Sequence, residues 1–186
     1  MKMKMNSQRH SIAMMAWLFV VAAFSACSLG DETEKANKLV DEGNAAVQDA
    51  KKNLTDAEEK KQKMLRAKVK PEEARASAKE AIDAYNKAEQ KCKEAAKKYE
   101  EASKLKIKDK FKEYLALKVK EYNKRADLVA TAKGVPQALI DSKNRAAFTS
   151  SAKATNEKVD KLTKDADDLG AQADKLQKDN PDIFKA

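Results

Sequence analysis

Few side chains in this sequence could do covalent chemistry. The chain has two cysteines, Cys27 and Cys92, and one histidine, His10. Cys27 follows a basic opening segment and a mostly apolar stretch, residues 11–26. A basic start, a short apolar stretch and small residues before a cleavage point are typical of an export signal. We therefore expect a signal peptide over residues 1–26, with cleavage placing the Cys27 thiol at the new N-terminus.

The residues just before and at the expected cleavage point are similar to a known cleavage motif. The run Phe24-Ser25-Ala26-Cys27 resembles the lipobox of bacterial lipoproteins, although Phe24 stands where a lipobox usually has leucine. The resemblance implies a covalent lipid on Cys27, a membrane anchor and a place in the bacterial cell envelope. Ser28 follows the cysteine, and by analogy with enterobacterial lipoproteins this favours the outer membrane over the inner membrane.

Two other interpretations of the N-terminal segment stay open. A membrane-spanning helix needs about 20 apolar residues, and the stretch 11–26 has only sixteen residues in all. Ordinary signal-peptidase cleavage before Cys27 requires a small residue three positions upstream, where Phe24 stands. Cleavage after Ser25, with Ala23 at the upstream position, is the secreted alternative. We favour the lipid anchor over both the secreted and the uncleaved form.

Loss of the signal peptide changes what chemistry the chain can do. The formal net charge falls from +9 to +6, because residues 1–26 hold three basic residues and no acidic ones, and His10 is removed. The remaining chain then has no histidine for acid–base catalysis and no Cys and His set to bind zinc. The four glycines are isolated, so no phosphate-binding loop is expected. We expect no enzyme, no metal and no cofactor except the lipid on Cys27.

The rest of the chain has the apolar spacing of helices and no convincing strand. Small and apolar residues recur at steps of four and three, which keeps one seam of a helix facing a partner. The expected seams are Ala36, Val40, Gly43, Val47, Ala50, Leu54, Ala57, Lys61 and Met64; Ala74, Ala78, Ala81, Tyr85, Ala88, Cys92, Ala95, Tyr99 and Ala102; Phe111, Leu115, Val119, Tyr122, Ala126 and Val129; and Phe148, Ala152, Thr155, Val159, Leu162, Ala166, Leu169, Ala173 and Leu176. We interpret Cys92 as a buried residue and not as a thiol that pairs two chains, and Tyr85 and Tyr99 as core residues and not as the lining of a ligand groove.

These seams predict an all-α fold, an elongated antiparallel four-helix bundle built as coiled-coil hairpins. A tether over 27–32 precedes a bundle over 33–180, and a tail covers 181–186. The expected helices span about 33–68, 71–104, 109–133 and 143–178, separated by Pro71, Gly134-Val135-Pro136 and Asn180-Pro181. Asp109 is the expected N-cap of the third helix. A continuous helix through 103–110, and a dimer in place of a monomer, stay open.

One stretch stands out by its charge. Residues 104–125 hold nine basic and three acidic residues. The lysines at its start are candidates for contact with an anionic surface, because such a surface attracts positively charged side chains. They are Lys104, Lys106, Lys108, Lys110 and Lys112. A solvated loop without a ligand is the alternative interpretation. Nucleic acid is not an expected partner outside the cytoplasm.

The sequence thus predicts a lipid-anchored, non-enzymatic helical scaffold or binding protein of the envelope. Its expected partners are the membrane and an envelope protein or an anionic polymer such as peptidoglycan. An alternative class is a protective polypeptide similar to late-embryogenesis-abundant proteins, which folds only on surfaces. High charge and small alanine seams motivate that alternative.

Overall fold

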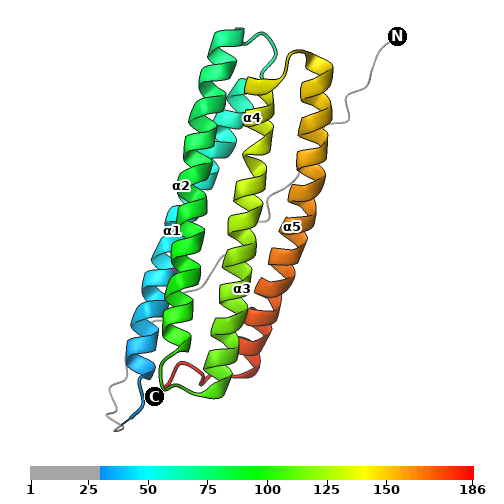
Figure 1. Cartoon of the computed structure of the whole chain (residues 1–186). Coiled ribbons are helices and arrows are strands. Elements are labelled where there is room, and N and C mark those ends of the chain that lie inside the picture. Colours follow the sequence, from blue (N-terminus) through cyan, green and yellow to red (C-terminus); the bar gives the residue numbers. More distant parts are fainter. Residues whose placement is uncertain (1–29) are drawn as a thin grey trace.

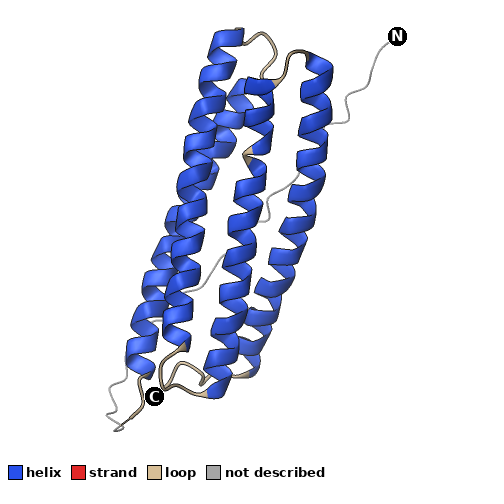
Figure 2. Cartoon of the chain, in the orientation of Figure 1, coloured by secondary structure: helices blue, strands red, loops and turns tan. Residues whose placement is uncertain are grey.

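The computed structural model describes residues 30–186 and confirms an all-α bundle (Figures 1 and 2). Its helices are α1 (Thr33–Met64), α2 (Pro71–Ser103), α3 (Asp109–Ala132), α4 (Gly134–Asp141) and α5 (Arg145–Asp179). Because α4 continues the direction of α3, these five helices make four rods that lie side by side along one long axis (Figure 1). α2 is the central helix of the arrangement, since it packs against α1, α3 and α4.

The seam predicted for α2 is confirmed at all nine positions, from Ala74 to Ala102, each of which is buried. The seam of α1 is confirmed at seven of its nine positions; Leu54 and Lys61 are half-buried. Cys92, Tyr85 and Tyr99 are core residues, as the spacing predicts. A seam of small residues lets two helices approach closely, so the first hairpin is a tight pair.

Gly43 marks the closest approach of α1 to α2. A Cβ atom at this position would lie 2.9 Å from Cε1 of Tyr99. The Tyr99 ring is fully buried, and its hydroxyl donates a hydrogen bond of 2.7 Å to Oδ1 of Asn44. Because that bond and the Tyr122 ring, 5.6 Å away between centroids, hold Tyr99 in place, only glycine fits opposite it.

The third rod is longer than the seam predicted over 111–129. α3 ends at Ala132, and α4 begins at Gly134 after a single interrupting residue, Lys133. Pro136 has no backbone N–H and so cannot complete the ladder to Ala132. The segment 134–142, which lies between the expected third and fourth helices, is helical as far as Asp141. The combined rod, residues 109–141, matches the other three in length, about 50 Å at 1.5 Å per residue.

The chain turns at 104–108 and does not continue as one helix. The amide of Leu105 donates to the carbonyl of Ala102, and that of Ile107 to the carbonyl of Leu105. Asp109 is the first residue of α3, so the N-cap is Lys108 and not Asp109 as the sequence predicts. α1 is also shorter than expected, because the chain leaves the helix after Met64 and Lys68 takes a left-handed conformation with φ of 73°.

The seam predicted for the last helix is only partly right. Within α5 the buried residues are Ala166, Gly170 and Ala173. The larger apolar residues of the seam, including Phe148, Val159 and Leu169, are half-buried. The reason is that α5 packs mainly on α3 and α4, at one flank of the bundle, whereas α2 is covered on several sides.

The segment after α5 packs against the bundle. Ile183 is buried, and the Phe184 ring contacts the Phe111 ring edge-on at 4.8 Å between centroids. Asn37 of α1 donates a hydrogen bond of 2.9 Å to the Phe184 carbonyl. Figure 1 shows this segment, the start of α1 and the 104–108 turn at one end of the rod, here called the base (residues 30–35, 100–113 and 178–186).

The opposite end, here called the tip, comprises residues 60–75 and 138–148. It contains the turns that join α1 to α2 and α4 to α5 (Figure 2). Met64, Ala74, Ala78 and Val135 form a small core cluster beneath them, with Val69, Ile140 and Phe148 packed against it. The two turns are therefore neighbours in space.

Core clusters at the base, the middle and the tip lie within residues 30–186. We predict that residues 28–186 alone give a strongly helical circular dichroism spectrum and one sharp thermal transition, because the clusters share α2. A weakly helical spectrum, or a melt that sharpens only after lipid is added, would contradict this prediction. In that case the surface-folding alternative would apply.

Candidate functional site

The residues with predicted roles fall in two places. Cys27, the expected lipidation residue, lies outside the described residues. Lys104, Lys106, Lys108, Lys110 and Lys112 lie together at the base, in the turn between α2 and α3 and the first turn of α3. The structure therefore brings the five predicted lysines to one end of the rod.

Acidic neighbours balance these lysines. Lys104 Nζ lies 2.7 Å from Glu100 Oε1, and Lys110 Nζ lies 2.7 Å from Glu113 Oε2. Lys108 Nζ donates to the Lys185 carbonyl at 2.6 Å. The base holds eight basic and nine acidic side chains in total. The cluster that looks strongly basic along the sequence is thus close to neutral in three dimensions.

The start of α1 is bonded directly to the lysine turn. The Glu32 amide donates to the Lys106 carbonyl at 2.9 Å, and the Lys106 amide donates to Glu32 Oε2 at 3.0 Å. The Lys106 amide lowers the pKa of the Glu32 carboxyl. This pair of bonds fixes residue 32, five residues after Cys27, against the 104–108 turn.

A buried charge cluster in the middle of the bundle was missed by the sequence analysis. Glu121 of α3 accepts from Lys118 Nζ at 2.6 Å and from Arg125 Nε at 2.8 Å. Lys118 and Glu121 are each about 1% exposed. Arg125 extends to Oδ1 of Asp167 on α5, at 3.1 Å. The cluster thus joins α3 to α5 by charge.

Gly170 of α5 gives the Glu121 side chain its space. A Cβ atom at position 170 would lie 3.2 Å from Glu121 Oε1. A buried ion pair is weak evidence of stability, because desolvation opposes the attraction. We interpret this cluster as a device that fixes how α3 and α5 align, and not as a site with free chemistry.

The spacing of residues along α3 could have predicted this cluster. The second inner face of α3 also alternates steps of four and three: Tyr114, Lys118, Glu121, Arg125, Leu128 and Ala132. α3 lies between α2 and α5, so it has two contact faces. A search for apolar seams finds the first face and passes over the second because half of its residues are charged.

A second charged group joins α2 to the junction of α3 and α4. Lys133 Nζ donates to Glu89 Oε2 at 2.6 Å and to Asn86 Oδ1 at 2.9 Å. Glu89 also accepts from Lys93 Nζ at 2.6 Å. The bonds from Lys133 and Lys93 lower the pKa of the Glu89 carboxyl. This group holds the one interruption in the third rod.

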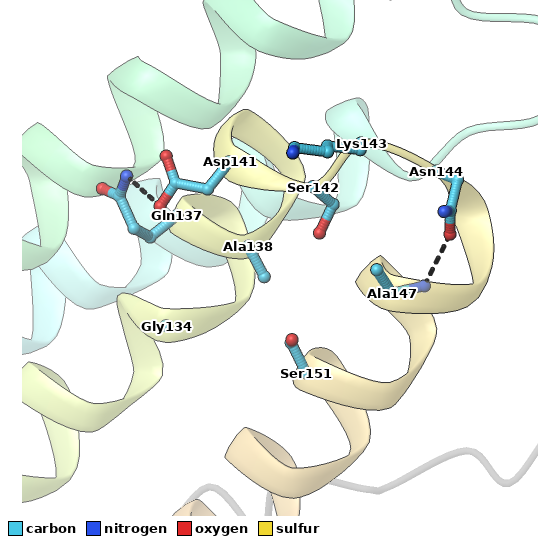
Figure 3. Close-up of a pocket in the computed structure, with 9 residues that line it drawn as sticks. All are labelled: Gly134, Gln137, Ala138, Asp141, Ser142, Lys143, Asn144, Ala147 and Ser151. Carbon is cyan, nitrogen blue, oxygen red and sulfur yellow. Dashed lines mark hydrogen bonds between the residues drawn. The ribbon is translucent and has the colours of Figure 1, made fainter.

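A shallow hollow lies between α4 and the start of α5 (Figure 3). Small side chains face it: Ala138, Ser142, Ala147 and Ser151. Two of its polar side chains are bonded locally, since Gln137 Nε2 donates to Asp141 and Asn144 Oδ1 accepts from the Ala147 amide. These lining residues do not form a nucleophile with a neighbouring base.

The remaining reactive groups of the described residues are enclosed. Cys92 is 4% exposed, and burial raises the pKa of its thiol to about 11. Burial also raises the pKa of Tyr85, whose hydroxyl donates to Glu58. Within residues 30–186, His, Cys, Asp and Glu side chains do not form a group that could hold a metal ion. None of the described helices is long and apolar enough to cross a membrane.

No protein-family model, curated protein or solved structure matches this chain.

The buried cluster makes a test of α3–α5 packing. We predict that Glu121→Ala lowers the free energy of unfolding by about 3–5 kcal/mol, because the buried Lys118 loses its 2.6 Å partner. Replacing both residues by methionine should recover most of the loss, since both charges then leave the interior. Urea unfolding measures both effects. The control is Glu157→Ala, which removes an exposed ion pair and should change the free energy of unfolding little. A loss at Glu121 no larger than the loss at Glu157 would contradict the prediction.

The contribution of Glu89 to stability can be tested by its dependence on pH. Its carboxyl has a folded pKa below the ordinary value of 4.5. The stabilisation is therefore present above about pH 4.5 and is lost as the pH falls through the folded pKa. We predict that Glu89→Gln costs about 1 kcal/mol at pH 7 and that the difference from the parent chain shrinks in acid. Glu94→Gln, at a more exposed pair, is the control. A difference independent of pH would contradict the assignment.

Proposed function

We propose that this chain is a lipid-anchored, non-enzymatic helical rod of the bacterial cell envelope. Its base would stand at the membrane, and the bundle would project about 50 Å from it. The orientation of the rod, with its base at the membrane, rests on one observation. Glu32 is bonded to the lysine turn at the base, and it follows Cys27 by five residues, a span of about 18 Å at most. A lipid on Cys27 would therefore hold the base close to the headgroups.

Within residues 30–186 the side chains do not assemble a catalytic group, and this favours a structural or binding role over an enzymatic one. The sequence holds its only histidine at position 10, within the expected signal peptide. Cys92 is buried with a raised thiol pKa, which is the reverse of what a nucleophilic or redox cysteine needs. The charged groups of the interior hold helices together. Their partners are other side chains of the bundle.

The surface-folding alternative has less support. Such a chain would lack a specific core, whereas α2 has fully enclosed tyrosines and an unbroken buried seam. Peptidoglycan binding by the base has less support too, because Lys104, Lys108 and Lys110 each have a partner there.

The anchor is tested by metabolic labelling with a radiolabelled fatty acid in bacteria that express the whole chain. We predict that the parent chain takes up label and that Cys27→Ala does not, because the thioether needs the Cys27 sulfur. Cys92→Ala is the matched control and should keep its label. Label that survives Cys27→Ala would overturn the anchor, and an unlabelled parent chain would do the same.

A further inference from the structure

Within residues 30–186 the net positive charge collects at the tip, at the opposite end from the lysine turn that the sequence draws attention to. Residues 60–75 and 138–148 hold nine basic and three acidic side chains, a net charge of +6. The base, by contrast, holds eight basic and nine acidic side chains. Two turns that are more than 65 residues apart in the chain make this surface, because the shared cluster beneath them brings them together.

Most of the cations at the tip have no acidic partner among residues 30–186. Lys60 and Lys61 pair with Asp56 and Glu58. The other seven are exposed, and no carboxylate of the described residues lies within 4 Å of their charged atoms. They are Lys63, Arg66, Lys68, Lys70, Arg75, Lys143 and Arg145. The acidic residues of the tip, Glu72, Glu73 and Asp141, are outnumbered.

An apolar side chain stands among these cations. Leu65 is 49% exposed, and among the described residues it is the one large hydrophobic side chain with such exposure. Met64 and Val69 hold the two sides of its turn in the core, so residues 65–68 project from the end of the rod. Lys68 has a φ of 73°, a conformation that glycine adopts without strain; here the position carries a cation.

We propose that the tip binds an anionic phospholipid surface. The unpartnered cations would lie at the phosphate groups, and Leu65 would enter the boundary of the acyl chains, as apolar residues of interfacial segments do. Charge alone would suit any polyanion equally. The projecting leucine in the middle of the cations favours a lipid surface, because a soluble acidic polymer offers no apolar layer to receive it.

This proposal does not rest on the lipid anchor. If the anchor is also present, the chain would contact lipid at both ends of a rod about 50 Å long. The short tether at the base could not bring the tip to the same surface unless the rod lay flat. Failure of the labelling experiment on Cys27 leaves the tip untouched, and failure at the tip leaves the anchor untouched.

Binding is measured by sedimentation with vesicles of phosphatidylcholine, with and without phosphatidylglycerol. The protein is residues 28–186, which hold every described helix and all three core clusters and carry no acyl chain. The chain should bind the vesicles that contain phosphatidylglycerol and should be released as salt rises from about 0.1 M to about 1 M, where the screening length falls from about 10 Å to about 3 Å.

Two variants at the tip and one at the base locate the surface. Replacing Arg66, Lys68 and Lys70 by glutamine should lower the partition coefficient about 100-fold, at about 1 kcal/mol per cation. Leu65→Ser should lower it about tenfold. The matched control replaces Lys104, Lys106 and Lys110 by glutamine, which removes the same charge from the base and should change binding less than about threefold.

Three results would overturn the proposal. The first is an equal loss in the base variant, which would mean attraction by total charge. The second is binding that Leu65→Ser leaves unchanged, which would mean that the tip has no apolar contact with lipid. The third is sedimentation with an acidic polysaccharide in the absence of vesicle binding. Circular dichroism of each variant excludes unfolding, and all the substituted residues are exposed.

Discussion

The close packing of α2 against its neighbours is the constraint on which the rest of the structure depends. Alanine at most seam positions keeps the neighbouring helices close, and the enclosed rings of Tyr85 and Tyr99 fill the wider parts of the interior. Each small residue buries little apolar area, so the stability must come from continuous contact along about 50 Å of helix. That requirement explains why the interruption at Lys133 is held by bonds to Glu89 and Asn86.

Charge has a different role at each level of the rod. In the middle, the Lys118, Glu121 and Arg125 cluster is enclosed, and it ties α3 to α5. At the base, Lys104 and Lys110 pair with carboxylates and Lys108 donates to a carbonyl, and the acidic side chains of that end leave it nearly neutral. At the tip, the cations face solvent. A single number for net charge hides this division, since the excess of positive charge within residues 30–186 lies almost wholly at the tip.

The two ends also differ in how their turns are held. At the base, the segment after α5 returns to α1 and α3 through Asn37 and the ring of Phe184. At the tip, only Met64, Val69 and a few neighbours hold the turns, and residues 65–68 extend outward. One end is therefore closed by packing, and the other exposes its turns. This asymmetry agrees with the proposed anchor at the base and the proposed contact at the tip.

The sequence by itself determined the helical class, the inner faces of α1 and α2 and the enclosure of Cys92, and it favoured a turn near 104–108 over a continuous helix. Those features are recorded in local spacing and in proline positions, which act within one helix. The tertiary structure alone decided that α3 has a second, charged inner face, that α5 is half-covered, and that Lys104 and Lys110 meet acids while Arg66 and Lys143 do not. Spacing shows which residues share a helix face. Which faces meet, and which long charged side chains reach each other, depends on the assembled bundle.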